Sequence, residues 1–329
     1  MIAVNPVLAR EMRSRMRGRR AAVLITFWLA FNGAVLAVVY LAAQNVAERQ
    51  FGFAGFANTF SIGRGIYEWT LCGMLGLMLL IVPAQAAGAI AGERERQTLI
   101  PLQVTLLSPW RILVGKIGAS VAFLVLLIVT GMPLLAVGYL VGGIAVADIV
   151  IGAGSVLVAG LLVAALCIAI STFARRVQSA TVLCYALVLA LSIGTLLAYG
   201  AYAVIDQSRG SDGADPPAAL LLVNPVAFVS DIVGDEQLSD LPSPFDGLHS
   251  LVNQDRSNNE PFVVDGPVVF DAATGQPVIG DPFGGIAAQA PSDEGVPFWV
   301  LSGLALSSAA VCALSLATWR LRTPAETER

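Results

Sequence analysis

Six long stretches of the sequence contain no Asp, Glu, Lys or Arg, and this absence of charge constrains the fold more than any other feature. They cover residues 21–47, 69–92, 117–147, 149–174, 177–205 and 295–319, whereas every other charge-free stretch has 15 residues or fewer. A helix needs about 20 apolar residues to cross a bilayer whose hydrocarbon core is ~30 Å thick. Backbone groups in lipid must also be paired within their own segment, so we predict six transmembrane helices.

The composition agrees with an all-α integral membrane protein. Charged residues make up 13% of the chain and the mean hydropathy is +0.76, whereas soluble domains carry about 25% charged residues. After trimming at Gly, Pro and polar edges, the predicted spans are 21–43, 67–91, 113–141, 147–172, 179–203 and 297–319. The other predicted parts are an N-terminal amphipathic helix (1–20), a connecting segment (92–112), a large loop (204–296) and a C-terminal tail (320–329).

Arginine and lysine are unevenly divided between the two sides of the membrane that six spans define. Four lie on the side of the large loop: Arg49, Arg64, Arg209 and Arg256. Fifteen lie on the side of both termini: Arg10, Arg13, Arg15, Arg17, Arg19, Arg20, Arg94, Arg96, Arg111, Lys116, Arg175, Arg176, Arg320, Arg322 and Arg329. Because basic residues near spans are retained in the cytoplasm, we predict that both termini and residues 92–112 are cytoplasmic.

The 204–296 loop is predicted to be extracytoplasmic, and fifteen acidic residues lie between Asp206 and Glu294. Asn224-Pro225 begins a short apolar run, and residues 220–234 resemble an amphipathic helix at the outer interface. Residues 261–280 contain the turn signals of one small β-hairpin. The alternative is a disordered acidic loop.

Several kinds of active site are excluded because the chain lacks their residues. The only lysine, Lys116, is followed by Ile117, so the sequence has no P-loop that could hold ATP. The only histidine, His249, is interpreted as a solvated loop residue, and one histidine supports neither an HExxH zinc site nor a Ser–His–Asp triad. Carboxylates between 231 and 240 could hold calcium, but a solvated acidic face fits their spacing better. We expect no catalytic, cofactor-binding or metal-binding residue here and no nucleic-acid partner.

The N-terminal sequence NPVLAREMRSRMRGRR (5–20) predicts an amphipathic helix on the cytoplasmic membrane surface. Asn5 can cap it, Pro6 suits its first position, and Leu8, Met12 and Met16 form an apolar stripe below the arginines. An alternative is that these arginines only set the orientation and bind anionic lipid.

A second cytoplasmic segment, GERERQTLIPLQVTLLSPWRIL (92–113), follows the second predicted span. Ala84, Gly88 and Gly92 recur at four-residue spacing just before it, which favours close helix packing. Alternating charges at 93–96 then precede a short amphipathic run that ends at Ser108-Pro109. By itself, this segment could be an ordinary connecting loop.

These two motifs, the Arg175-Arg176 turn and the six spans together resemble the permease subunits of bacterial type-2 ABC exporters, over about residues 1–205 and 297–319. The resemblance implies a multi-pass protein of the bacterial cytoplasmic (inner) membrane and a second copy or related permease. It also implies a separate cytoplasmic ATPase that binds ATP and magnesium, so that no cofactor is expected in this chain. By matching motif, the ATPase would contact Glu93, Arg94, Glu95, Arg96 and Thr98, with support from Arg10, Glu11 and Arg13.

Two other functions were weighed against transport. The chain could be a membrane anchor or sensor whose acidic 204–296 loop binds an envelope protein. An intramembrane enzyme is disfavoured because the predicted spans contain no catalytic histidine, paired carboxylates or Cys–His set. The few polar groups in the spans suit a lipid-like, amphipathic or polymeric cargo, but the sequence does not choose a substrate.

Cysteine labelling in cells tests the predicted topology. Cysteines introduced within 206–294 should react with a membrane-impermeant maleimide in intact cells, because this loop is predicted to face outward. Cysteines within 93–111 should react only after the membrane is permeabilised. The opposite pattern would contradict both the orientation and a cytoplasmic ATPase partner.

Overall fold

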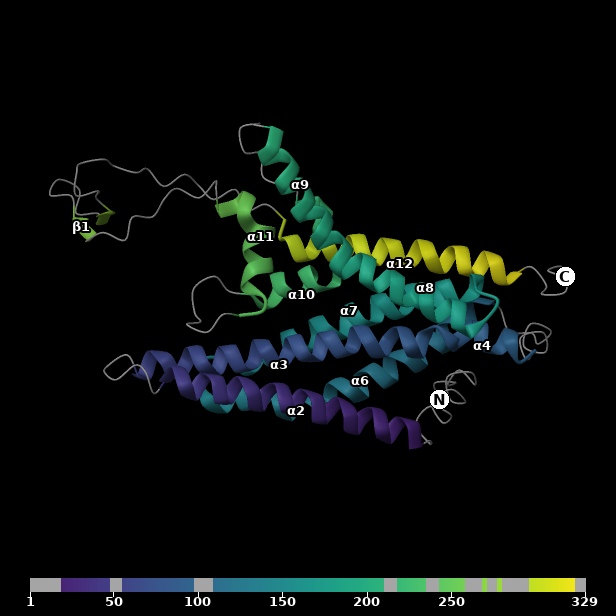
Figure 1. Cartoon of the computed structure of the whole chain (residues 1–329), viewed down its shortest axis with the longest axis horizontal. Helices are drawn as coiled ribbons and strands as arrows, with labels where there is room; N and C mark the ends of the chain where they lie inside the picture. Colours follow the sequence, from purple (N-terminus) through teal and green to yellow (C-terminus); the bar gives the residue numbers. More distant parts are fainter. Residues whose placement is uncertain are drawn as a thin grey trace.

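The protein is an elongated bundle of helices in the computed structural model (Figure 1). The structure describes residues 19–47, 55–97, 109–209, 218–234, 243–257, 268–270, 277–279 and 296–322. Six helical segments within these ranges are long and apolar enough to cross a membrane, which agrees with the predicted number of spans. The predicted N-terminal helix lies outside the described residues, apart from its last two positions.

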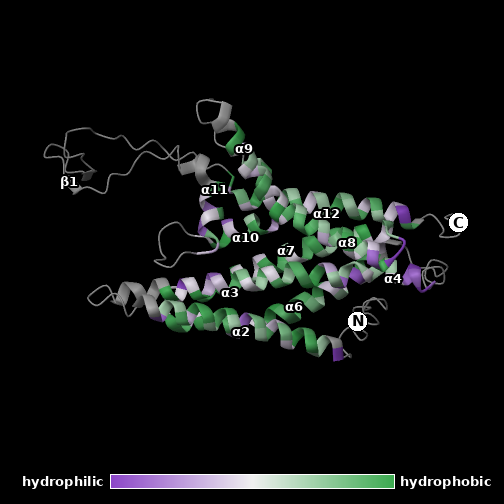
Figure 2. Ribbon diagram, viewed as in Figure 1, coloured by the Kyte–Doolittle hydropathy of each residue, from purple (hydrophilic) through white to green (hydrophobic). Residues whose placement is uncertain are grey.

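The helices of the bundle follow the six apolar stretches in order. They are α2 (Arg19–Ala47), α3 (Gly55–Ala86), α4 (Gly88–Glu95), α6 (Pro109–Val141), α7 (Val146–Phe173), α8 (Val177–Leu189), η1 (Ala190–Gly194), α9 (Thr195–Arg209) and α12 (Phe298–Arg322). Apolar residues cover the middle of these helices, and polar residues gather toward their ends (Figure 2).

Helix α7 lies at the centre of the bundle and packs against α3, α6, α10 and α12. Its small residues allow neighbouring side chains to approach its backbone closely. A Cβ on Gly152 would lie 2.0 Å from the Tyr67 hydroxyl oxygen, and one on Gly160 would lie 2.3 Å from the Met78 sulfur. Glycine at these positions therefore permits α3 to pack directly onto α7. Helix α2 lies at the edge of the bundle and is mostly exposed.

Two helices continue through residues that end a charge-free stretch. Helix α3 begins well before the predicted span and contains Arg64 and Glu68, while α6 contains Lys116. Glu68 and Lys116 are both buried. The predicted spans 67–91 and 113–141 already include Glu68 and Lys116, and in the structure each of these charges has a partner of opposite sign.

The fifth span changes from α-helical to π-helical hydrogen bonding at Ala190–Gly194. A wide turn of this kind frees a backbone carbonyl group, and the amide of buried Asn224 donates to the Ser192 carbonyl oxygen at 3.0 Å and to the Thr195 hydroxyl at 2.9 Å. The Asn224 side-chain oxygen meanwhile accepts from the Val226 backbone N–H at 2.8 Å, which caps the next helix. One side chain thus joins the fifth span to that helix.

Helix α10 (Pro225–Val233) begins where the Asn224-Pro225 signal predicts a helix. It differs from an interfacial helix because most of its residues are buried against α7, α11 (Asp246–Ser257) and α12. A short 3-10 turn, η2 (Ala218–Leu221), precedes it. Together these elements cover one end of the bundle (Figure 1).

Two three-residue strands lie in the predicted hairpin region. Strand β1 (Val268–Phe270) pairs antiparallel with β2 (Pro277–Ile279), with Val269 opposite Val278. Residues 271–276, which would form the turn, lie outside the described residues. The hairpin as a whole therefore stays a prediction.

His249 was interpreted as a solvated residue, and the structure corrects this. Its side chain is 16% exposed, and Nδ1 lies 3.8 Å from an oxygen of Asp231 on α10. The second oxygen of Asp231 accepts from the Trp299 backbone N–H at 2.8 Å. Asp231 therefore links α10 to α11 and to the start of α12. In the described part of the chain, no group of three or more His, Cys, Asp or Glu residues is placed so that it could hold a metal ion.

A glycine pair on α3 tests the close packing of the bundle. A Cβ on Gly63 would lie 1.6 Å from the Gly142 carbonyl oxygen, so Gly63→Ala forces two backbones apart and should cost about 2 kcal/mol or more. Gly76 on the same helix has open space beside it, so Gly76→Ala is the matched control and should leave stability unchanged or raise it by up to about 1 kcal/mol. Thermal unfolding in detergent measures both, and equal unfolding temperatures would contradict the close approach.

Candidate functional site

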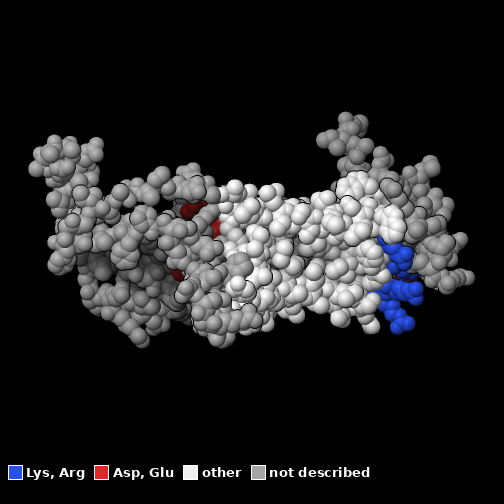
Figure 3. All heavy atoms as spheres, turned by 90° about the horizontal axis from the view of Figure 1, so that it is seen from above, with Lys and Arg blue, Asp and Glu red and all other residues white. Residues whose placement is uncertain are grey.

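The two ends of the bundle carry opposite charge. Lysine and arginine side chains gather at one end and acidic side chains at the other, with an uncharged surface between them (Figure 3). We call the first the basic end, which includes Arg94, Arg96, Lys116, Arg175 and Arg176, and the second the acidic end, which includes Asp148, Asp231 and Asp246. The predicted ATPase-contacting residues that the structure describes all lie at the basic end: Glu93, Arg94 and Glu95 on α4, and Arg96 directly after it.

Helix α4 is separated from α3 by a single turn residue, Ala87, whose backbone N–H donates to the Pro83 carbonyl oxygen at 2.9 Å. The first N–H groups of a helix have no partner within it. The buried Ser171 hydroxyl on α7 accepts from the backbone N–H groups of Ile90 at 3.1 Å and Ala91 at 3.0 Å, and it donates to the Ala87 carbonyl oxygen. Ser171 thus satisfies the start of α4 and fixes it to α7.

An ion pair holds α4 against α6. Lys116 Nζ lies 2.9 Å from Glu93 Oε1, and the lysine side chain is only 2% exposed. A lysine buried to this degree is stable only with an anionic partner close by. Glu93 was predicted to contact an ATPase, but the structure shows it partly buried and bound to Lys116 within the chain.

The next two residues bind the turn between α7 and α8. Arg94 donates from Nη1 to the Ala174 carbonyl oxygen at 2.9 Å, and the Val177 backbone N–H donates to Glu95 Oε2 at 3.3 Å. A cation near the end of α7 and a carboxylate near the start of α8 also suit the helix dipoles. The turn that contains Arg175 and Arg176 is therefore attached to α4.

The end of α4 is exposed. Glu95, Arg96 and Gln97 are open to the surroundings, whereas Glu93 and Arg94 are partly buried. Gln97 has φ of 58°, the left-handed conformation that commonly terminates a helix. The predicted contact residues Thr98, Arg10, Glu11 and Arg13 lie outside the described residues.

The predicted packing stripe is divided between two neighbours. A Cβ on Gly88 or Gly92 would lie 3.8 or 3.7 Å from Val177 on α8, which is ordinary contact distance. Ala84 instead lines an apolar groove of about 660 Å³ beside α2, together with Gln85 and Tyr185. Only the two glycines therefore lie against the start of α8.

Sequence reasoning missed Lys116 and Ser171 as parts of this site. Both are distant in sequence from the groups that they bind. Lys116 lies 23 residues from Glu93, and Ser171 lies about 80 residues from the N–H groups whose hydrogen bonds it accepts. The only available signals were a lysine next to a charge-free stretch and a serine within one.

Comparison of the chain with protein-family models and with curated proteins finds no match.

This site presents the charged end of a helix that other parts of the chain hold in place, and we call it the braced end of α4. Ser171, Lys116 and the α7–α8 turn hold α4 from three directions, and the charges of Glu95 and Arg96 are presented outward. Such an arrangement suits contact with a protein surface, because little conformational entropy is lost when a fixed surface binds.

A double-mutant cycle tests the ion pair between Lys116 and Glu93. Lys116→Met alone leaves the Glu93 carboxylate without its lysine and should lower the free energy of unfolding by about 3 kcal/mol. Combining it with Glu93→Met removes both charges and should recover most of this loss. Thermal unfolding of the four proteins in detergent measures the coupling. Additive effects would show that the two side chains do not interact.

Proposed function

We propose that this chain is the membrane-spanning permease subunit of an ATP-binding cassette exporter, which works with a second permease and is driven by a separate cytoplasmic ATPase. The observation that carries this proposal is the braced end of α4. Its exposed charges lie at the basic end, which the distribution of arginine predicts to be cytoplasmic. The resemblance of residues 92–113 to the ATPase-contacting segment of type-2 exporters supports the same function.

The position of charges in the spans also favours an external energy source. Proton-driven carriers need ionisable groups within the membrane. Here Arg64, Glu68 and Lys116 lie outside the six charge-free stretches, and each takes part in an ion pair. The charge-free stretches between them offer no relay across the bundle. Energy for transport is therefore expected to enter through the cytoplasmic surface.

The contacts divide the predicted docking residues into two groups. Arg96 is exposed and can reach a partner, whereas Glu93 and Arg94 hold α4 against α6 and α7. Glu95 is exposed as well, but it also accepts from the Val177 backbone N–H at the start of α8. A force applied to the end of α4 would thus be passed directly to two other spans. Exposed Arg96, whose guanidinium can bind a carboxylate with two hydrogen bonds, is the best single candidate for contact with the ATPase.

Purification of the tagged chain in mild detergent tests this function. We expect a P-loop ATPase to co-purify with the wild-type chain and to hydrolyse ATP. Arg96→Gln should reduce the amount of bound ATPase about tenfold, because it removes a charge-assisted contact of about 1.4 kcal/mol.

Gln178→Glu provides the matched control. It changes the charge of the same end by the same amount, at an exposed position on the first turn of α8, where a carboxylate is favourable. The ATPase should be retained in this variant. An envelope protein in place of an ATPase would instead favour the membrane-anchor or sensor function.

A further inference from the structure

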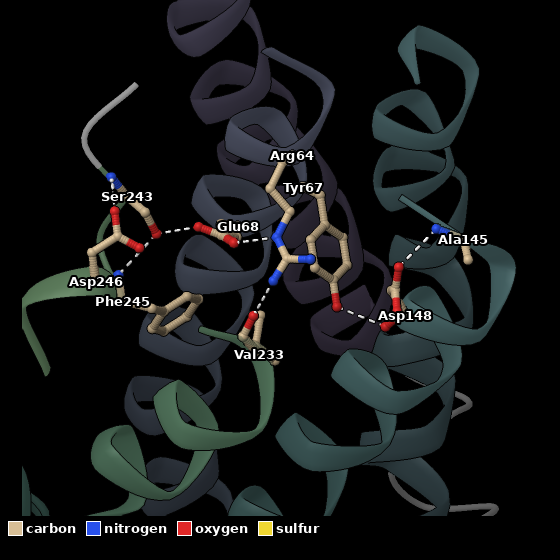
Figure 4. Close-up of polar contacts among 9 residues, drawn as sticks. All are labelled: Arg64, Tyr67, Glu68, Ala145, Asp148, Val233, Ser243, Phe245 and Asp246. Atoms are coloured by element: carbon tan, nitrogen blue, oxygen red, sulfur yellow. Dashed lines mark hydrogen bonds and ion pairs between the residues drawn. The ribbon is translucent and has the colours of Figure 1, made fainter. Parts of the chain in front are cut away.

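Two charged side chains of α3 form an ion pair at the acidic end of the bundle (Figure 4). Arg64 Nε lies 2.5 Å from Glu68 Oε1, with side chains 12% and 2% exposed. Residues four apart lie on the same face of a helix. This face is turned toward the ends of α10 and α11 (Figure 4).

Each member of the pair binds a different helix of the acidic end. Arg64 Nη2 donates to the Val233 carbonyl oxygen at the end of α10, and the Ser243 hydroxyl, which lies just before α11, donates to Glu68 Oε2. Ser243 is itself held in place, since its backbone N–H donates to Asp246 Oδ2 at 3.1 Å. We call residues 218–234 and 243–257 the outer cap. The ion pair fastens both of its helices to α3.

Arg64 and Glu68 belong to a part of α3 that is fixed to the α6–α7 turn. The Tyr67 hydroxyl donates to the Asp148 carbonyl oxygen at 2.7 Å, and Gly63 packs against the Gly142 carbonyl group. Asp148 in turn accepts from the Ala145 backbone N–H at 2.7 Å. The outer parts of α3, α6 and α7 therefore form one unit. This unit meets the cap where α7 packs against α10 and where Arg64 and Glu68 bond to Val233 and Ser243.

The cap is attached on its other side to α9 and α12. Asn224 bonds to Ser192 and Thr195 of the fifth span, and the Ser302 hydroxyl of α12 donates to the Leu222 carbonyl oxygen at 2.8 Å. These contacts are between neutral groups and lie close to the residues that lead into α9 and α12. The Asp231 carboxylate of α10 also accepts from the Trp299 backbone N–H at the start of α12. The cap thus bridges two parts of the bundle, and an ion pair contacts it only on the α3 side among these described contacts.

We propose that Arg64 and Glu68 form a latch that closes the acidic end of the bundle, and that movement of α3 away from the cap opens it. Movement of α3 away from the cap leaves the ion pair within α3 but breaks the bonds of Arg64 to Val233 and of Ser243 to Glu68. A partial separation would leave buried charged groups without these partners, so the latch has two distinct states, made and broken. Apart from the turn at Ala87, the helix that carries the latch continues into braced α4 at the basic end. This inference rests on the proposed function, since the ATPase would supply the movement.

Labelling of a buried cap residue tests the latch. Ser230 on α10 is fully buried, and its Ser230→Cys variant, with the four native cysteines replaced by alanine, would be placed in lipid nanodiscs. Glu68→Gln should raise the rate of reaction with a soluble maleimide at least about tenfold, because a charged hydrogen-bonded contact is lost. Ser243→Ala removes one contact and should raise the rate less.

Ser250→Ala is the matched control. It changes an exposed serine of the same cap whose hydroxyl bonds only within α11, to the Gly247 carbonyl oxygen, so the labelling rate should stay within about twofold of its starting value. Equal rates for Glu68→Gln, Ser243→Ala and Ser250→Ala would overturn the latch. If Glu68→Gln fails to fold, Ser243→Ala against Ser250→Ala decides the question.

A second measurement separates a moving latch from a purely structural contact. With the ATPase bound, ATP should accelerate labelling of the Ser230→Cys protein several-fold, and Glu68→Gln should make labelling fast with or without ATP. If the ATPase binds but ATP leaves the rate unchanged, the opening movement is overturned while the proposed function stands. If no ATPase binds, the proposed function fails, and the rates of the variants alone still test the latch.

Discussion

Pairing of charge inside an apolar bundle is the interaction on which the rest of this structure depends. An unpaired charge in such surroundings is strongly destabilising, whereas a paired one is tolerated and fixes geometry. Lys116 with Glu93 at the basic end and Arg64 with Glu68 at the acidic end are two examples among the described residues. Each pair lets a helix continue through a charged residue and joins it to other parts of the chain.

The two ion pairs lie at opposite ends of two consecutive helices, α3 and α4. Helix α3 carries Arg64 and Glu68, and α4, which follows after one turn residue, carries Glu93. Central α7 contacts both helices, through Ser171 near α4 and through Gly152 and Gly160 along α3. The end of α4 is therefore in contact with α6 and α7 as well as continuing from α3. This connectivity is what an ATP-driven permease would need between its docking surface and its outer end.

Signals confined to a few neighbouring residues were sufficient for much of the fold. Long charge-free stretches predicted the six apolar helices, and Asn224-Pro225 predicted the start of α10. The environment of single polar residues could not be predicted in this way. Asn224 also bonds to Ser192, and His249 lies against Asp231, because the chain brings together residues that are distant in sequence. The exposed charges of α4 were visible beforehand, but not which of them are bound within the chain.

The sequence by itself determined that the chain must place six apolar helices in an apolar solvent, because backbone groups there must be paired within each segment. It also determined which connections are rich in arginine. Only the tertiary structure decided which distant groups the buried charges bind. The partners of Glu68 on the cap and of Arg64 at Val233 lie 175 and 169 residues away along the chain. Coulombic and hydrogen-bond energies depend on distance in space, and the packing of α3, α7 and α10 sets that distance.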